Sequence, residues 1–81
     1  MRISIKDRIL EKDFQRKILL ELANGYSYKE IKQKLKITDY EMRYCIKFLY
    51  NNYNAVNKIS LVCRAICAKD IDITKIKIWK I

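Results

Sequence analysis

Basic, phenolic and amide side chains recur at helical spacing in the middle of the chain, at Tyr40, Arg43, Tyr44, Lys47 and Asn51. Residues spaced by three or four positions share one face of a helix. An Arg can pair with O6 and N7 of guanine and an Asn with adenine, whereas a cation that meets only phosphate positions a protein without reading the sequence. The pattern therefore predicts contact with duplex DNA, either at base edges or at phosphates alone. For the two tyrosines, which can touch thymine methyl groups or bond phosphate, an ordinary amphipathic surface is the alternative.

Two predicted helices joined by a tight turn position these residues. Ser27 with Glu30, and Thr38 with Glu41, have the spacing of a capping box, in which hydroxyl and carboxylate satisfy N–H groups of the first helical turn. The predicted helices span residues 27–36 and 39–53. The apolar residues expected in the core are Ile31, Leu35 and Ile37, then Met42, Cys45, Ile46, Leu49 and Tyr53. A short helix, a turn and a second helix with a basic, aromatic outer face form the helix-turn-helix arrangement that reads duplex DNA.

The start of the first of these helices is a candidate phosphate site, because unpaired N–H groups and the helix dipole favour an anion there. Ser27, Tyr28 and Lys29 lie at this point, although Ser27 also serves as a cap. Lys36 and Thr38 are further candidates for phosphate contact, as is the more distant Lys58, which the following part of the chain contributes.

A helix over residues 9–24 is expected to precede this unit. Asp13 can cap it, and Gly25 can end it, because glycine enters the left-handed backbone region without strain. The buried stripe expected for this helix comprises Phe14, Ile18, Leu19 and Leu22.

A fourth helix is predicted over residues 57–69, capped by Asn57. Its apolar residues cover most of its circumference, so it needs cover on more than one side. We expect it to pack on its own core and on a second subunit; the alternative is that the C-terminal tail folds back over it. The residues assigned to the dimer interface are Ile59, Leu61, Val62, Ala65, Ile66 and Ala68. Cys63 and Cys67 are interpreted as small buried or interface residues, not as a metal site.

Isoleucines alternate with polar residues at both ends of the chain. Residues 1–8 are expected to form a short strand or an extended arm, with a frayed basic terminus as the alternative. Residues 70–81 favour a strand. The isoleucines expected to pair, within one chain or between two, are Ile3 and Ile5 with Ile76 and Ile78.

Composition narrows the class of function. The 81 residues suffice for one domain, and 18 Lys and Arg against nine Asp and Glu give a formal charge of +9, which favours a polyanionic partner through counterion release. A solvated basic surface is the alternative. The lack of His, of a Cys-x-x-Cys pair and of a Gly-rich phosphate loop argues against an enzyme, a metal site or a cofactor. With no apolar run of about 18 residues and no signal peptide, we expect a cytoplasmic protein that does not enter a membrane.

Several short motifs occur in a fixed register between residues 15 and 65. They are Leu22-Ala23-Asn24-Gly25, Ser27-Tyr28-Lys29-Glu30-Ile31, Leu35, Ile37-Thr38 and Asn57-Lys58. In these motifs the chain resembles the LuxR-type (GerE-like) helix-turn-helix domain of bacterial transcription regulators. It departs from the usual family residues at Glu41-Met42-Arg43, where Thr-Val-Lys is usual, at Cys45, where His is usual, and at Phe48, where Asn is common.

Pattern and resemblance together predict an all-α fold, a compact four-helix helix-turn-helix domain over residues 1–81 with short extended or β segments at its ends. The resemblance implies that residues 39–53 are a recognition helix in the major groove, with Arg43, Tyr44 and Lys47 at positions that meet DNA. It also implies a homodimer, formed by the last helix, that reads an inverted repeat. The chain would be a free-standing bacterial or phage member without a receiver or ligand-sensing domain. The alternative function is a protein-interaction module that binds another regulator or RNA polymerase without DNA.

Overall fold

The computed structural model describes residues 4–76, except for the side chain of Ile73. Its helices are α1 (Ile5–Arg8), α2 (Lys12–Ala23), α3 (Tyr28–Leu35), α4 (Asp39–Tyr53), α5 (Lys58–Cys67) and the 3-10 turn η1 (Ile73–Lys75). These residues contain no strand, so the all-α prediction is confirmed, with a short extra helix at the start. In this part of the chain no helix has the length and apolar character needed to cross a membrane.

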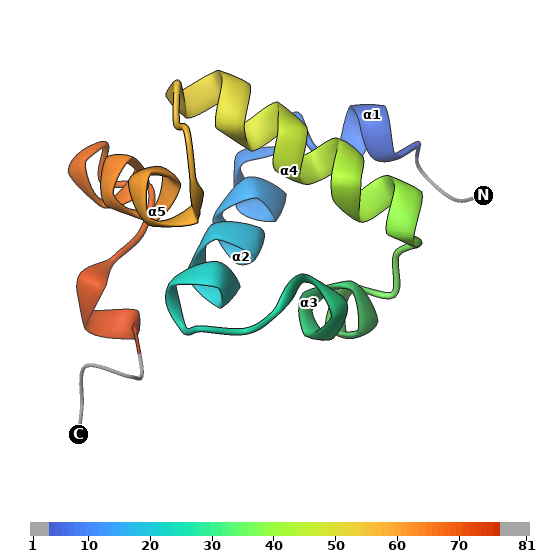
Figure 1. Ribbon diagram of the computed structural model, residues 1–81, viewed down its shortest axis with the longest axis horizontal. Helices are drawn as coiled ribbons and strands as arrows, with labels where there is room; N and C mark the ends of the chain where they lie inside the picture. Colours follow the sequence, from blue (N-terminus) through green and yellow to red (C-terminus); the bar gives the residue numbers. More distant parts are fainter. Residues whose placement is uncertain (1–3, 77–81) are drawn as a thin grey trace.

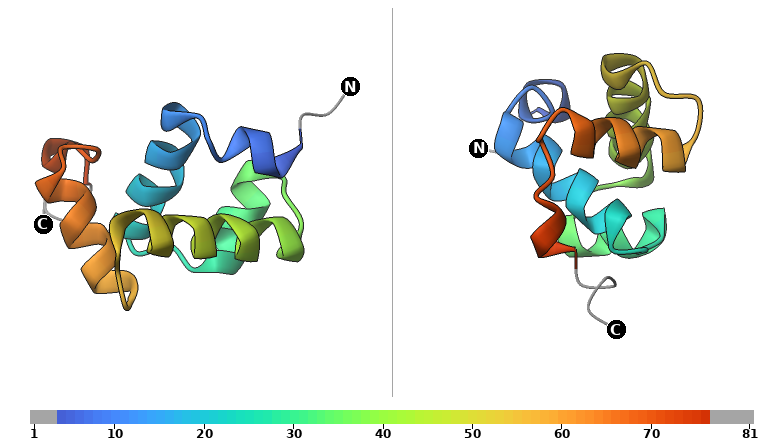
Figure 2. Two further views of the ribbon diagram at one scale, coloured as in Figure 1. Left: turned by 90° about the horizontal axis from the view of Figure 1, so that it is seen from above. Right: turned by 90° about the vertical axis from the view of Figure 1, so that its left-hand side faces the viewer.

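The longest helix, α4, runs along one side of the molecule, and the other helices are arranged around it (Figure 1). It contacts α1 and α3 toward its amino end and α5 toward its carboxyl end, while α2 contacts α3 and α5 (Figure 2). The core between them is built from Ile5, Ile9, Phe14, Ile18, Leu19, Leu22, Ile31, Ile37, Met42, Cys45, Ile46, Leu49, Leu61, Ala65, Ile71 and Ile76. This packing holds α3 and α4 at a fixed angle to each other.

Both predicted capping boxes are present. In α3 the Ser27 hydroxyl accepts from the Glu30 N–H at 3.2 Å, and the Ser27 N–H donates to the Glu30 carboxylate at 3.1 Å. Thr38 and Glu41 make the same pair of bonds at the start of α4, at 3.1 and 2.9 Å. Lys36 ends α3 in the left-handed region with φ of 57°, which turns the chain sharply into α4. The helix, tight turn and helix of the prediction are therefore confirmed.

The start of α2 differs from the prediction. The helix begins at Lys12 with Glu11 in the cap position, and Asp13 lies inside the first turn, so its assignment as the cap is wrong. An acid in the first turn still interacts favourably with the helix dipole. The end agrees with the prediction, because Gly25 adopts φ of 86° and its N–H donates to the Leu22 carbonyl at 3.0 Å.

The start of the chain is helical where an extended segment over residues 1–8 was expected. Within the described part, Ile5 and Ile9 are buried one helical turn apart, a spacing that a helix satisfies and a strand does not. The prediction is therefore wrong from residue 4 onward, and Ile3 lies outside the described residues.

The tail after α5 forms the turn η1 in place of the predicted strand over 70–81. Ile71 and Ile76, on either side of this turn, are both buried in the core. The strand prediction is wrong up to residue 76, because the two isoleucines enter the core separately instead of lining one face. Ile78 lies outside the described residues.

Candidate nucleic-acid interface

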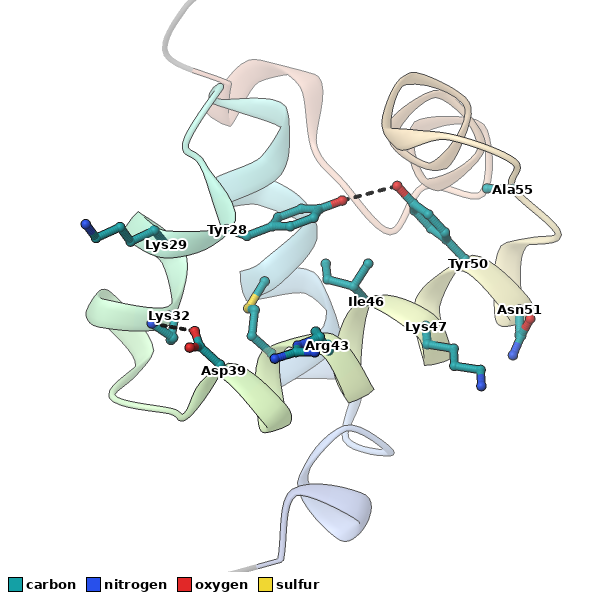
Figure 3. A pocket seen from close by; sticks show the side chains of 11 residues that line it. Tyr28, Lys29, Lys32, Asp39, Arg43, Ile46, Lys47, Tyr50, Asn51 and Ala55 are labelled. Atoms are coloured by element: carbon teal, nitrogen blue, oxygen red, sulfur yellow. Dashed lines mark hydrogen bonds and ion pairs between the residues drawn. The ribbon is translucent and has the colours of Figure 1, made fainter.

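A groove of about 740 Å³ lies between α3 and α4 (Figure 3). Residues of both helices and the loop after α4 line it: Tyr28, Lys29, Lys32, Asp39, Met42, Arg43, Ile46, Lys47, Tyr50, Asn51 and Ala55. Met42 and Ile46 are buried, whereas Arg43 and Lys47 are exposed. The groove therefore combines an apolar floor with a cationic rim.

The charges around the groove are almost all positive. Asp39 is the one carboxylate among the lining residues, and Lys32 Nζ donates to its Oδ1 at 2.5 Å. This hydrogen bond holds the pKa of the Asp39 carboxyl below its ordinary value. Lys29, Arg43 and Lys47 have no ion-pair partner within residues 4–76. A groove attracts polyanions when its carboxylate is neutralised by a lysine and its other cations have no ion-pair partner.

The predicted recognition face only partly coincides with this groove. Arg43, Lys47 and Asn51 of that face line the groove, together with the predicted phosphate contacts Tyr28 and Lys29. Two tyrosines lie outside the groove lining: Tyr40, with an exposed fraction of 66%, and Tyr44, which is half-buried against the core.

The remaining phosphate candidates also lie outside the groove lining. Ser27 and Thr38 use their hydroxyl oxygens and their own N–H groups in the two capping boxes, so neither N–H is open to a phosphate. Lys36 is exposed in the turn between α3 and α4. Lys58 is half-buried, and its Nζ donates to the Tyr26 carbonyl at 3.4 Å.

Tyr50 is a groove residue that the sequence pattern did not single out. Its hydroxyl oxygen lies 3.2 Å from that of Tyr28, across one end of the groove (Figure 3). Burial, and then this hydrogen bond, raise the pKa of Tyr28 to about 12, so Tyr28 keeps its hydroxyl proton at neutral pH. Tyr50 follows Arg43 by seven residues and Lys47 by three, and this helical spacing was the available signal.

No protein-family model matches the chain, and neither curated proteins nor solved structures give a significant match.

One side of α5 is buried and the other is open. Leu61 and Ala65 are fully buried against the core of their own chain, so assigning them to a dimer interface is wrong. The helix turns this side toward α2 and α4, with which it is in contact. The other predicted interface residues keep exposed or partly exposed surface: Ile59, Val62, Ile66 and Ala68. Ile59, Val62 and Ile66 follow helical spacing and form an apolar strip on the open side of α5, with Ile59 exposed and the other two partly buried against the core. Ala68 follows the helix and is not part of this strip.

The cysteines divide into one buried and two exposed residues. Cys63 and Cys67 are exposed on α5, so reading them as buried is wrong, while an interface role stays a prediction. Cys45 is buried in the core, and desolvation raises the pKa of its thiol to about 11. Across residues 4–76 there is no group of three or more His, Cys, Asp and Glu side chains that could hold a metal ion.

Proposed function

We propose that this chain is a sequence-specific, double-stranded DNA-binding regulator of transcription that uses α4 as its recognition helix. The observation that carries the proposal is the position of Arg43 and Lys47, exposed at the rim of the groove and without an ion-pair partner in residues 4–76. The major groove of DNA, about 12 Å wide, admits one α-helix. The 15 residues of α4 span about 22 Å at 1.5 Å per residue, so several turns can follow that groove.

Different residues have different roles in this proposal. Arg43 and Asn51 are the candidates for base contacts, because each can form two hydrogen bonds to one base edge. Lys47, Lys29 and Tyr28 are candidates for the phosphates on either side. The formal charge of +9 supports the affinity through counterion release from the duplex.

We also propose that two copies pair through the apolar strip of α5. Its residues are Ile59, Val62 and Ile66, and Ile59 has an exposed fraction of 76%. A two-fold dimer reads an inverted repeat, with half-sites separated by about one turn of DNA. Ile59→Glu should then sediment as a folded monomer at micromolar concentration where the parent sediments as a dimer. A monomeric parent would remove the dimer from the proposal.

The exposed apolar residues also favour a second candidate, a protein-interaction module that binds another regulator or RNA polymerase without DNA. Val56 and Ile59 have exposed fractions of 86% and 76%. Large exposed apolar side chains that lie together mark protein contacts more often than nucleic-acid contacts. Under either candidate the protein acts in the cytoplasm, without catalysis and without a cofactor.

Selection of duplexes from a random pool distinguishes the two candidates. Retained duplexes should share a motif arranged as an inverted repeat, and binding should weaken steeply as salt is raised. A pool that stays random after repeated rounds at low salt would refute sequence-specific binding and leave the protein-interaction module as the better candidate.

A further inference from the structure

Two polar pairs span the groove at its opposite ends (Figure 3). At one end the ammonium group of Lys32 bonds the carboxylate of Asp39. At the other end the hydroxyl groups of Tyr28 and Tyr50 meet at 3.2 Å. In the first pair the carboxylate neutralises the ammonium charge, so this pair attracts a further anion only weakly. The second pair is neutral and has hydrogen-bonding capacity left.

The hydroxyl pair has one hydrogen left to donate. Two phenols carry two hydroxyl hydrogens, and the bond between Tyr28 and Tyr50 uses only one of them. No acceptor for the second hydrogen occurs among the hydrogen bonds within residues 4–76. The pair lies at an exposed site, so an oxygen atom of a ligand can reach this hydrogen.

The charge near the hydroxyl pair selects an anionic acceptor. The Lys58 ammonium lies 5.9 Å from the centroid of the Tyr28 ring, whereas the Lys29 side chain points away from the pair (Figure 3). The nearest acid in sequence, Glu30, turns its carboxylate back to the Ser27 N–H and is occupied there. A free hydroxyl hydrogen with an ammonium group nearby suits a phosphate oxygen.

We propose that the Tyr28–Tyr50 hydroxyl pair binds one phosphodiester of the DNA backbone, and that Tyr50 is thereby a DNA-contacting residue of α4. This inference rests on the proposed DNA-binding function and adds a contact at the end of the groove opposite to the Lys32–Asp39 pair (Figure 3). A hydroxyl group releases no counterion, so the contact strengthens binding to all sequences without adding to its salt dependence. Its effect is to fix how far α4 is rotated and shifted in the major groove.

The test combines Tyr50→Phe with a scan of single methylphosphonate substitutions along the selected duplex. The variant should bind about 10- to 150-fold more weakly, as expected for a lost hydrogen bond to a charged group, with the salt slope unchanged. At one phosphate in each half-site, the methylphosphonate should weaken DNA binding by the parent protein by a similar factor. The same substitution should weaken binding by the Tyr50→Phe variant little further, because the contact is already lost. The inference would be overturned if the losses from Tyr50→Phe and from the methylphosphonate multiplied at every phosphate. It would also be overturned if the variant bound DNA with the affinity of the parent.

Two controls separate this contact from a structural role and from the proposed function. Tyr53→Phe removes a hydroxyl bonded to Asp70, and neither residue lines the groove, so this variant should lower the thermal midpoint and leave DNA affinity unchanged. If Tyr50→Phe behaves in that way instead, the pair only joins α3 to α4. If the parent selects duplexes and only the Tyr50 result fails, the DNA-binding function stands without this contact; if no duplex is retained, both are refuted.

Discussion

Replacing Arg43 and Lys47 together by alanine should weaken DNA binding while leaving the fold intact. Both side chains are exposed in the middle of α4 and have no ion-pair partner within residues 4–76. Alanine favours a helix slightly more than either residue, and such surface substitutions change the free energy of unfolding by about 0.5 kcal/mol or less. Two such substitutions add to about 1 kcal/mol at most, so for a domain of this size the thermal midpoint should move by roughly 4 to 8 °C or less.

The effect on binding follows from the two charges removed. Each cation that neutralises a phosphate adds about 0.9 to the slope of log K against log salt. The slope should therefore fall by about 0.9 for each bound subunit where Lys47 alone meets phosphate, and by about 1.8 where Arg43 meets phosphate as well. A residue that reads a base contributes about 1–3 kcal/mol, or roughly 5- to 150-fold in affinity, on the preferred sequence only. The single variants, Arg43→Ala and Lys47→Ala, show which residue reads bases and which meets phosphate.

Fluorescence anisotropy on selected and on random duplexes, over a series of salt concentrations, measures both quantities. Lys17→Ala is the matched control, because Lys17 is an exposed cation on α2 that does not line the groove. It should change neither the affinity nor the slope by a comparable amount. A double variant that binds with the affinity and slope of the parent would refute the assignment of the recognition face. Equal losses in the control would mean that overall charge, and not this face, attracts DNA.

The core and the thiols give three further expectations. Leu61→Ala should lower the free energy of unfolding of the monomer by about 2–5 kcal/mol because it leaves a cavity, whereas Ile59→Ala should change it by about 0.5 kcal/mol or less. Urea melts at a protein concentration too low for dimers compare the two variants, and equal losses would contradict the orientation of α5. A thiol reagent should modify Cys63 and Cys67 in the native protein but Cys45 only after unfolding, and three fast thiols would contradict the burial of Cys45. Burial raises the pKa of Cys45 from 9.0 to about 11, so the folded state holds this proton more tightly than the unfolded state. The associated stability is present below pH 9.0 and is lost as the pH rises through about 11; Cys45→Ala should remove this dependence in alkaline denaturation curves, and an unchanged dependence would contradict it.

Local signals in the sequence were sufficient to predict the two helices that form the groove. Each capping box joins residues only three positions apart, so its geometry does not depend on the rest of the fold. The stripe of Met42, Cys45, Ile46 and Leu49 was also predictable, because a strict helical period leaves one possible buried face. The exposure of Arg43 on the other side of α4 then follows directly.

Contacts between distant parts of the chain could not be predicted in this way. Tyr28 and Tyr50 are 22 residues apart, and their meeting depends on the angle between α3 and α4. Similarly, the apolar circumference of α5 did not indicate which side is turned inward, and the structure places Leu61 and Ala65 there. At the tail, alternating isoleucines suit a strand, but Ile71 and Ile76 are buried in the core. That core is formed by helices from distant parts of the chain, so the sequence of the tail alone does not indicate it.

The acids at the start of α4 create a conflict that the fold resolves. Asp39 and Glu41 stabilise the first turn through the helix dipole, yet they lie on the helix proposed to enter a strongly anionic groove of DNA. Glu41 is bonded to the Thr38 N–H, and Asp39 is paired with Lys32, a residue of the preceding helix. The helix therefore keeps its acidic start while the rim of the groove stays cationic. The charge that α4 would present to DNA therefore depends on α3 as well, since without Lys32 the Asp39 carboxylate would be left facing Arg43 and would offset its charge.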